Sequence, residues 1–128
     1  MNIVIYDTEE KNSVVISKHI KEVLPRATVT MFSKAEDLIE FAKEETVHVA
    51  FINVDDAGGK GFLMAKEFWS SHPKMNLIFI SEHTRYLKEA WNMHISGYLS
   101  HIPSKEEVEN ELFELKYPVE LQLGSVSI

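Results

Sequence analysis

Cysteine is absent from the 128-residue chain, which excludes disulfides, thiolate zinc sites and cysteine nucleophiles. Basic residues are also scarce: 13 Lys and Arg stand against 20 Asp and Glu, for a net charge of −7. Binding to nucleic-acid phosphates or to an anionic membrane surface needs clustered Lys and Arg, so neither partner is expected for residues 1–117. No apolar run approaches the roughly 20 residues of a membrane helix. The composition therefore predicts an ordinary globular domain, which we expect to be cytoplasmic.

Two periodicities alternate along the chain. Short runs with consecutive apolar residues are typical of strands covered on both faces, hence of a parallel sheet. These runs are Asn2–Tyr6, Val47–Ile52 and Leu77–Ile80. Arg26–Phe32 alternates and uses β-branched residues, which favours a strand nearer an edge, and Gly97–Ser100 is a weaker fifth strand.

Helical patterns separate the predicted strands. Two of them open with a capping box, Ser33 with Glu36 and Ser104 with Glu107. We expect Trp69 and Trp91 to lie on helices and to cover edges of the core. The predicted helices span Glu9–Val23, Ser33–Glu45, Lys60–Ser71, Arg85–Met93 and a last segment from Ser104 to near Pro118. The βαβαβαβαβα order predicts an α/β fold with a doubly wound, five-stranded parallel sheet.

Ligands of doubly wound sheets bind at the carboxyl ends of the strands. The side chains predicted there are Asp7 and Thr8, Asn53, Ser81, and His101 after Ser100. This arrangement resembles the receiver domain of two-component response regulators, the CheY-like family with a flavodoxin-like fold, over about residues 2–117. Asn53 stands eight residues before Gly61, where the family has its phosphoacceptor Asp, and Gly97–Leu99 resembles the segment before the family's Lys.

The resemblance implies a phosphoacceptor pocket, but this sequence departs from it at three positions. Asn53 replaces the acceptor Asp, Thr8 replaces one of the two acids after the first strand, and His101 replaces the Lys. An amide oxygen is a poor nucleophile, and a single carboxylate is too little for Mg²⁺ without substrate phosphates. We therefore expect a degenerate pseudo-receiver that is not an enzyme and holds no metal or cofactor.

Ser81 and Tyr98 match the family, in which the aromatic residue changes between exposed and buried positions. We expect His101 to point toward Asp7 and Asn53, so that a protonated imidazole would neutralise Asp7 and make the pocket pH-sensitive. One alternative stays open. Asp55 lies two residues beyond Asn53 on the same side of the extended chain, and it is a second candidate for the phosphoacceptor.

Receivers that control transcription often dimerise through the fourth helix, fifth strand and fifth helix. Here the fourth helix carries Arg85 and Lys88, and the fifth helix carries the acids Glu106, Glu107, Glu109, Glu111 and Glu114. A two-fold axis would bring each strip against its complement, which predicts a weak, salt-sensitive homodimer. The alternative is a monomer whose charged faces are simply solvated.

Residues 118–128 form a tail outside the receiver-like unit of residues 1–117. Within it, Val119–Ile128 alternates like a strand, which predicts either an extra edge strand of the sheet or the first strand of an output domain. The resemblance is greatest to receivers that precede a LytTR-type DNA-binding domain, which would start here. The sequence thus predicts the regulatory part of a transcriptional response regulator, acting through protein–protein contacts with a sensor kinase or an output domain and without Asp phosphorylation. The other alternative is a stand-alone interaction module with no DNA-binding output.

Overall fold

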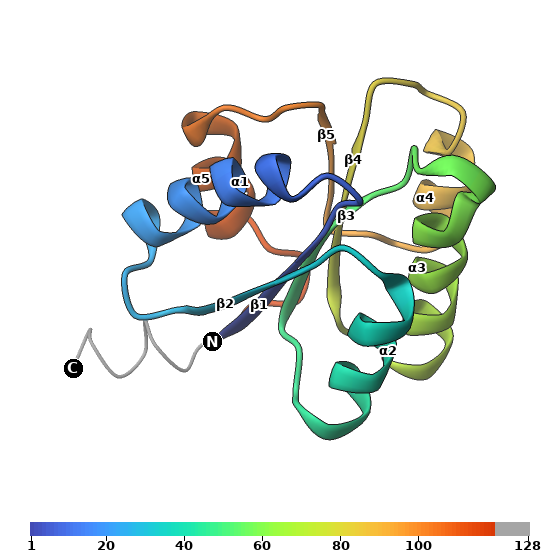
Figure 1. The fold of residues 1–128 in the computed structure, drawn as a ribbon, viewed down its shortest axis with the longest axis horizontal. Helices are drawn as coiled ribbons and strands as arrows, with labels where there is room; N and C mark the ends of the chain where they lie inside the picture. Colours follow the sequence, from blue (N-terminus) through green and yellow to red (C-terminus); the bar gives the residue numbers. More distant parts are fainter. Residues whose placement is uncertain (120–128) are drawn as a thin grey trace.

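Five parallel strands form one sheet in the computed structural model, which describes residues 1–119 (Figure 1). The order across the sheet is β2-β1-β3-β4-β5, so the chain winds first toward one edge and then toward the other. The strands are β1 (Asn2–Tyr6), β2 (Thr28–Phe32), β3 (Val49–Asn53), β4 (Asn76–Ser81) and β5 (Gly97–Ser100). The predicted doubly wound parallel sheet is confirmed.

Helices cover both faces of the sheet (Figure 1). They are α1 (Glu10–Val23), α2 (Ala35–Glu44), α3 (Lys60–Ser71), α4 (Leu87–Asn92) and α5 (Lys105–Phe113), with a short 3₁₀ turn η1 (Ala57–Gly59) before α3. The core is split accordingly: α1 and α5 pack on one face, and α2, α3 and α4 pack on the other.

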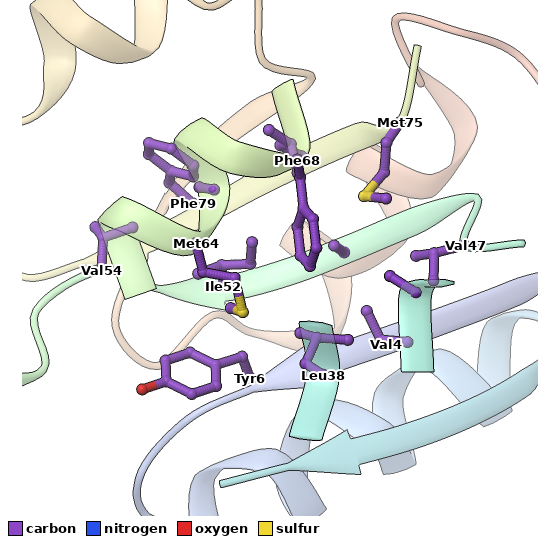
Figure 2. Packing of buried hydrophobic residues seen from close by; sticks show 14 of the residues in the cluster. Val4, Tyr6, Leu38, Val47, Ile52, Val54, Met64, Phe68, Met75 and Phe79 are labelled. Atoms are coloured by element: carbon purple, nitrogen blue, oxygen red, sulfur yellow. The ribbon is translucent and has the colours of Figure 1, made fainter. Parts of the chain in front are cut away.

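Alternation within the central strands fills both halves of the core. In β1, Ile3 and Ile5 face α1 and α5, whereas Val4 and Tyr6 face the α2–α4 side (Figure 2). β3 and β4 divide in the same way, and β4 is buried along its whole length. This two-sided burial explains why these strands appear in the sequence as continuous apolar runs. By contrast, β2 is partly exposed throughout, as expected of an edge strand.

Two local predictions differ from the structure. The capping box at Ser33 is wrong: α2 begins at Ala35, its N-cap is Lys34, and no side chain caps it. Ser33 is therefore one residue too early for its hydroxyl to reach the N3 amide. The second box is confirmed, because Glu107 N donates to Ser104 Oγ and Ser104 N donates to Glu107 Oε1.

The expectation that both tryptophans cover the core is also wrong for one of them. Trp91 is 81% exposed, while Trp69 is 37% exposed. α4 has only six residues and directs Ala90 inward, so Trp91 falls on its outer side. Within residues 1–119, none of the helices is long and apolar enough to span a membrane. The predicted strand-like tail concerns residues that, from 120 to 128, lie outside the described part of the chain.

Candidate functional site

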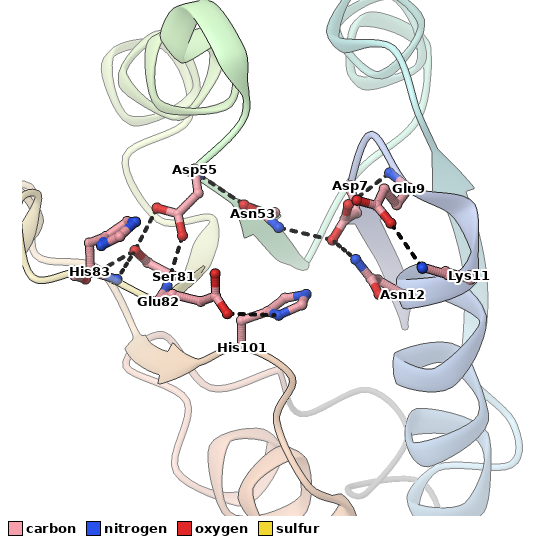
Figure 3. Close-up of polar contacts among 10 residues, drawn as sticks. All are labelled: Asp7, Glu9, Lys11, Asn12, Asn53, Asp55, Ser81, Glu82, His83 and His101. Atoms are coloured by element: carbon pink, nitrogen blue, oxygen red, sulfur yellow. Dashed lines mark hydrogen bonds and ion pairs between the residues drawn. The ribbon is translucent and has the colours of Figure 1, made fainter.

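A polar cleft of about 180 Å³ lies at the carboxyl ends of the strands. It brings together residues that follow β1, β3, β4 and β5, as the fold requires of neighbouring parallel strands. Its lining residues are Asp7, Thr8, Glu9, Asn12, Asn53, Asp55, Asp56, Glu82 and His101. Ser81 borders the cleft through its contact with Asp55 (Figure 3).

Asp7 is the buried acid of the cleft, with only 2% of its surface exposed. Its carboxylate accepts three hydrogen bonds: from Glu9 N at 2.8 Å, from Asn12 Nδ2 at 3.2 Å and from Asn53 Nδ2 at 3.0 Å. Among residues 1–119, no Lys, Arg or His forms an ion pair with it; the carboxylate is satisfied by one backbone amide and two side-chain amides. A buried carboxylate is tolerated when its oxygens are hydrogen-bonded in this way.

Asn53 uses both ends of its amide. Its Nδ2 donates to Asp7, and its Oδ1 accepts from Asp55 N at 2.8 Å. An aspartate at this position would lose the donor and would place a second carboxylate about 3 Å from Asp7, where like charges oppose ionisation. An amide fits this position beside Asp7 because its nitrogen donates where a second carboxylate would repel.

Asp55 turns away from Asp7 and toward the end of β4 (Figure 3). Its Oδ1 accepts from Ser81 Oγ at 2.6 Å, and its Oδ2 accepts from Glu82 N at 2.7 Å. The fully buried Val54, whose N donates to Ile80 O, fixes the loop between Asn53 and Asp55. The sequence suggested Asp55 only as an alternative phosphoacceptor, on the same side of the chain as Asn53. Nothing local in the sequence indicated that its partners would be Ser81 and Glu82 at the end of β4.

A hydrogen-bonded path leads from Ser81 to Tyr98. Ser81 Oγ accepts from His83 N at 2.9 Å, and the His83 carbonyl accepts from the Tyr98 hydroxyl at 2.8 Å. The Tyr98 ring lies 6.1 Å from the Phe79 ring, centroid to centroid. Tyr98 is thus half-buried and turned toward the β4–α4 loop rather than free in solvent.

His101 lines the cleft, but its ion-pair partner differs from the one we expected. Its Nδ1 lies 3.9 Å from Glu82 Oε1, and no contact joins it to Asp7 or Asn53 in residues 1–119. The reason is topological: β3 and β4 separate β5 from β1, so a residue after β5 meets the loop after β4 first. A protonated His101 would therefore neutralise Glu82 and not Asp7.

Gly61 and Tyr6 fix the loop that follows Asn53. A Cβ on Gly61 would lie 2.4 Å from the Asn53 carbonyl oxygen, so only glycine permits this approach of α3. Asp56 accepts from Gly61 N at 2.9 Å and from the Tyr6 hydroxyl at 3.1 Å. Burial, reinforced by the Asp56 charge, raises the pKa of the Tyr6 phenol, which keeps it a donor.

The acids of the cleft do not form a metal-binding group. Among residues 1–119, no three His, Asp or Glu side chains are placed to hold a metal ion together. Asp7 and Asp55 are directed to different donors, and Asp56 is engaged by Tyr6 and Gly61. Thr8 is exposed at the rim and supplies no carboxylate.

The predicted interface residues lie on and beside α4 and α5. Arg85 and Lys88 are exposed, and the Arg85 guanidinium lies 6.0 Å from the centre of the Tyr86 ring. Two acids of the strip are already engaged: Glu107 in the capping box and Glu111 against Gly97. Burial and the neighbouring Glu114 raise the pKa of Glu111.

Sequence reasoning missed the apolar part of this surface. Leu87 is 45% exposed and lies one turn from Trp91 on α4. Both border a shallow cavity of about 290 Å³, which is lined by Leu87, Ala90, Trp91, His94, Ile95, Gly97, Tyr98 and Lys116. The helical spacing of Leu87 and Trp91 was the available signal, but it equally suits burial against the sheet.

No family model and no curated protein matches the sequence. Solved structures do match. The response regulatory domain of protein mrkE from Klebsiella pneumoniae has a TM-score of 0.80 at 19% identity, covering 90% of this chain and 94% of that one. RcsB from Salmonella enterica serovar Typhimurium, bound to promoter rprA in the presence of phosphomimetic BeF3⁻, gives 0.77 at 20% identity.

The match to RcsB covers 99% of this chain and 66% of that structure. A CheY-like receiver domain protein from Methanospirillum hungatei gives a TM-score of 0.77 at 12% identity, with 88% and 90% of the two chains covered. At such identities the likeness establishes architecture. The chain therefore has the fold of CheY-like response regulator receiver domains.

Proposed function

We propose that this chain is a receiver-like signalling domain, not an enzyme, that acts through protein contacts and is not phosphorylated on aspartate. The observation that carries the proposal is Asn53 at the acceptor position, bonded at both ends of its amide. Phosphorylation would need a carboxylate nucleophile there, since an amide oxygen yields no stable acyl phosphate. Asp7 alone, already saturated by three donors, offers little to Mg²⁺.

Incubation with acetyl phosphate and Mg²⁺, followed by intact mass measurement, tests this directly. The wild-type chain should gain no phosphoryl group. The double variant Thr8→Asp with Asn53→Asp restores the acids of the family and serves as the positive control. An adduct on the wild-type chain would contradict the proposal, and peptide mapping would then identify the residue.

Asp55 is the alternative acceptor, and its contacts argue against that role. Both of its oxygens accept short hydrogen bonds, from Ser81 Oγ and Glu82 N. Charge-assisted bonds of this length withdraw electron density from the carboxylate and would have to break before it attacked phosphorus. An adduct that maps to Asp55 in the mass experiment would favour the alternative.

The partner surface we assign is the α4–β5–α5 face. It combines the exposed cations Arg85 and Lys88 with the acidic strip of α5, and α4 also carries the exposed apolar pair Leu87 and Trp91. Exposed ion pairs contribute only ~0–1 kcal/mol each, so the charges would set register and the apolar pair would carry affinity. Tyr98 lines the cavity beside this pair, and its hydroxyl donates to the His83 carbonyl.

A weak, salt-sensitive homodimer follows from this surface. Sedimentation at rising concentration should show self-association that Trp91→Ser abolishes and that Arg85→Glu with Lys88→Glu weakens. Lys11→Glu, an exposed charge reversal on α1, is the matched control and should leave association unchanged. A dimer that persists in Trp91→Ser and in the Arg85→Glu, Lys88→Glu variant would place the interface elsewhere. A chain that stays monomeric at every concentration would contradict the proposed homodimer.

A transcriptional role is the context we assign to the domain. RcsB, which shares the fold, was solved on a promoter, but the acidic balance here means that a separate domain would bind DNA. Tyr117 N donates to Asn76 Oδ1 and Asn76 Nδ2 donates to Tyr117 O, both at 2.8 Å, so the segment after α5 is held against the start of β4. A basic, LytTR-type continuation of the gene beyond Ile128 would support this context; its absence would favour a stand-alone interaction module.

A further inference from the structure

We propose that the end of β4 is an oxyanion site that this chain fills with its own Asp55 carboxylate. The donors are the Ser81 hydroxyl and the Glu82 backbone amide, each paired with one carboxylate oxygen. One part of this inference rests on the proposed function, namely that the internal carboxylate holds the signalling domain in one state without a phosphoryl group.

The site is assembled from two strand ends, those of β3 and β4. Ser81 is the last residue of β4 and is 3% exposed, so its hydroxyl is held in place. Asp55 comes from the loop after β3, and its own amide is anchored on Asn53 Oδ1. Asn53 therefore has a second effect besides neutralising the acceptor position: it aims Asp55 at the donors on β4.

The Asp55 carboxylate is held in this site by hydrogen bonds alone. The two bonds are 2.6 Å and 2.7 Å long, within the range of charge-assisted bonds, and no Lys or Arg forms an ion pair with Asp55 in residues 1–119. A hydroxyl and a backbone amide that converge on two oxygens recognise any oxyanion of similar size, carboxylate or phosphate. Removing the Asp55 side chain would therefore free the Glu82 amide and would leave the Ser81 hydroxyl with the His83 carbonyl, at 3.0 Å, as its other acceptor.

Occupancy of the site is linked to the α4–β5 face. Ser81 Oγ accepts from His83 N, and the His83 carbonyl accepts from the Tyr98 hydroxyl. Tyr98 in turn lines the cavity beside Leu87 and Trp91. The Asp55 carboxylate thus sits at one end of a continuous path whose other end is the proposed partner surface.

The test is a titration of the Asp55→Ala variant with inorganic phosphate, in which amide NMR spectra are recorded at each phosphate concentration. We expect saturable binding on the order of tenfold tighter than in the wild-type chain, with the largest shifts at Glu82 and His83. Glu9→Ala is the matched control: it removes the same charge from the same cleft but does not touch Ser81. The Tyr98 ring signals should move in Asp55→Ala and return toward wild-type positions as phosphate binds.

Three results would overturn the proposal: no binding by a folded Asp55→Ala, equal binding by the wild-type chain, or equal gain in Glu9→Ala, which would show a net-charge effect only. If Asp55→Ala does not fold, hydrogen exchange on the wild-type chain decides, because the Glu82 amide must then be protected despite its exposed side chain. Exchange at an unprotected rate would refute the site. Inorganic phosphate transfers no phosphoryl group to a side chain, so these outcomes are independent of the acetyl phosphate experiment.

Discussion

Asp7 and Asp55 line the same cleft but are satisfied in opposite ways. Asp7 is buried at the end of β1 and accepts from three donors, two of which are side-chain amides. Asp55 is half-buried, reaches across to β4 and accepts from one hydroxyl and one backbone amide. Neither forms an ion pair with a Lys, Arg or His in the described part of the chain. The cleft therefore gives each of its two carboxylates a separate set of hydrogen-bond donors.

Asn53 is what keeps the two halves of the cleft separate. Its amide nitrogen serves Asp7, and its amide oxygen holds the backbone of Asp55. A carboxylate at this position would join the halves into one acidic cluster that needs a metal ion. One amide therefore serves both halves: its nitrogen donates to Asp7, which a carboxylate could not do, and its oxygen accepts from the Asp55 amide.

The largest effect should follow from Asn53→Asp. The change removes the donor to Asp7 and places two carboxylates in contact, so we expect a loss of about 2–4 kcal/mol in the free energy of unfolding without metal. Urea denaturation at neutral pH measures it. Asn92→Asp makes the same chemical change at an exposed position on α4 and should have little effect.

Millimolar Mg²⁺ should recover part of the stability lost in Asn53→Asp, because a divalent cation would neutralise the joined acids. The double variant with Thr8→Asp should be less stable still without metal and should recover more with it. An unchanged melting temperature for Asn53→Asp in the absence of metal would mean that Asp7 and Asn53 do not share one cleft.

A double-mutant cycle on the other half of the cleft should give the next largest effect. Asp55→Ala and Ser81→Ala each remove one side of a short hydrogen bond, and we expect a coupling energy of about 1–2 kcal/mol between them. Pairing Asp55→Ala with Ser70→Ala, an exposed serine on α3, is the control cycle and should give additive losses. Additivity in the Ser81 cycle would show that the bond contributes nothing.

The sequence predicted the scaffold well because burial there is two-sided and continuous. The bounds of β1, β5 and α3 coincide with the predicted ranges, since apolar runs and helical periodicity are local signals. The capping box at Ser104 is equally local and was predicted correctly. The capping box at Ser33 was predicted wrongly, because packing of Ala35 and Leu38 sets the start of α2 and no side chain caps it.

The partners within the cleft were less predictable because they depend on contacts distant in sequence. Position alone placed Asp7, Asn53 and His101 at the same edge of the sheet. It did not reveal that Asp55 crosses to Ser81, 26 residues away, or that His101 pairs with Glu82. Such choices depend on loop direction, which no periodicity encodes. The prediction that Trp91 covers the core was wrong for a related reason, because a six-residue helix has too few turns for the sequence to define its buried side.

Glu111 offers the smallest and most specific test, because it is a carboxylate without the donors that Asp7 and Asp55 have. It lies against Gly97, and no hydrogen bond or ion pair satisfies it within residues 1–119. Burial and Glu114 raise its pKa, so the folded state favours the protonated form, and stability is lost as pH rises from the unfolded pKa through the raised folded one. Glu111→Gln keeps the shape and removes the charge.

We therefore expect Glu111→Gln to raise the free energy of unfolding at neutral pH by less than about 0.5 kcal/mol, since solvent screens a half-exposed carboxylate. The gain should vanish below about pH 4, where Glu111 is protonated in both folded and unfolded states. Thermal melts across pH measure this, with the exposed Glu106→Gln as the matched variant on α5. A gain that persists at low pH would arise from packing rather than charge, and a loss at neutral pH would mean that Glu111 has a donor and belongs with Asp7 and Asp55.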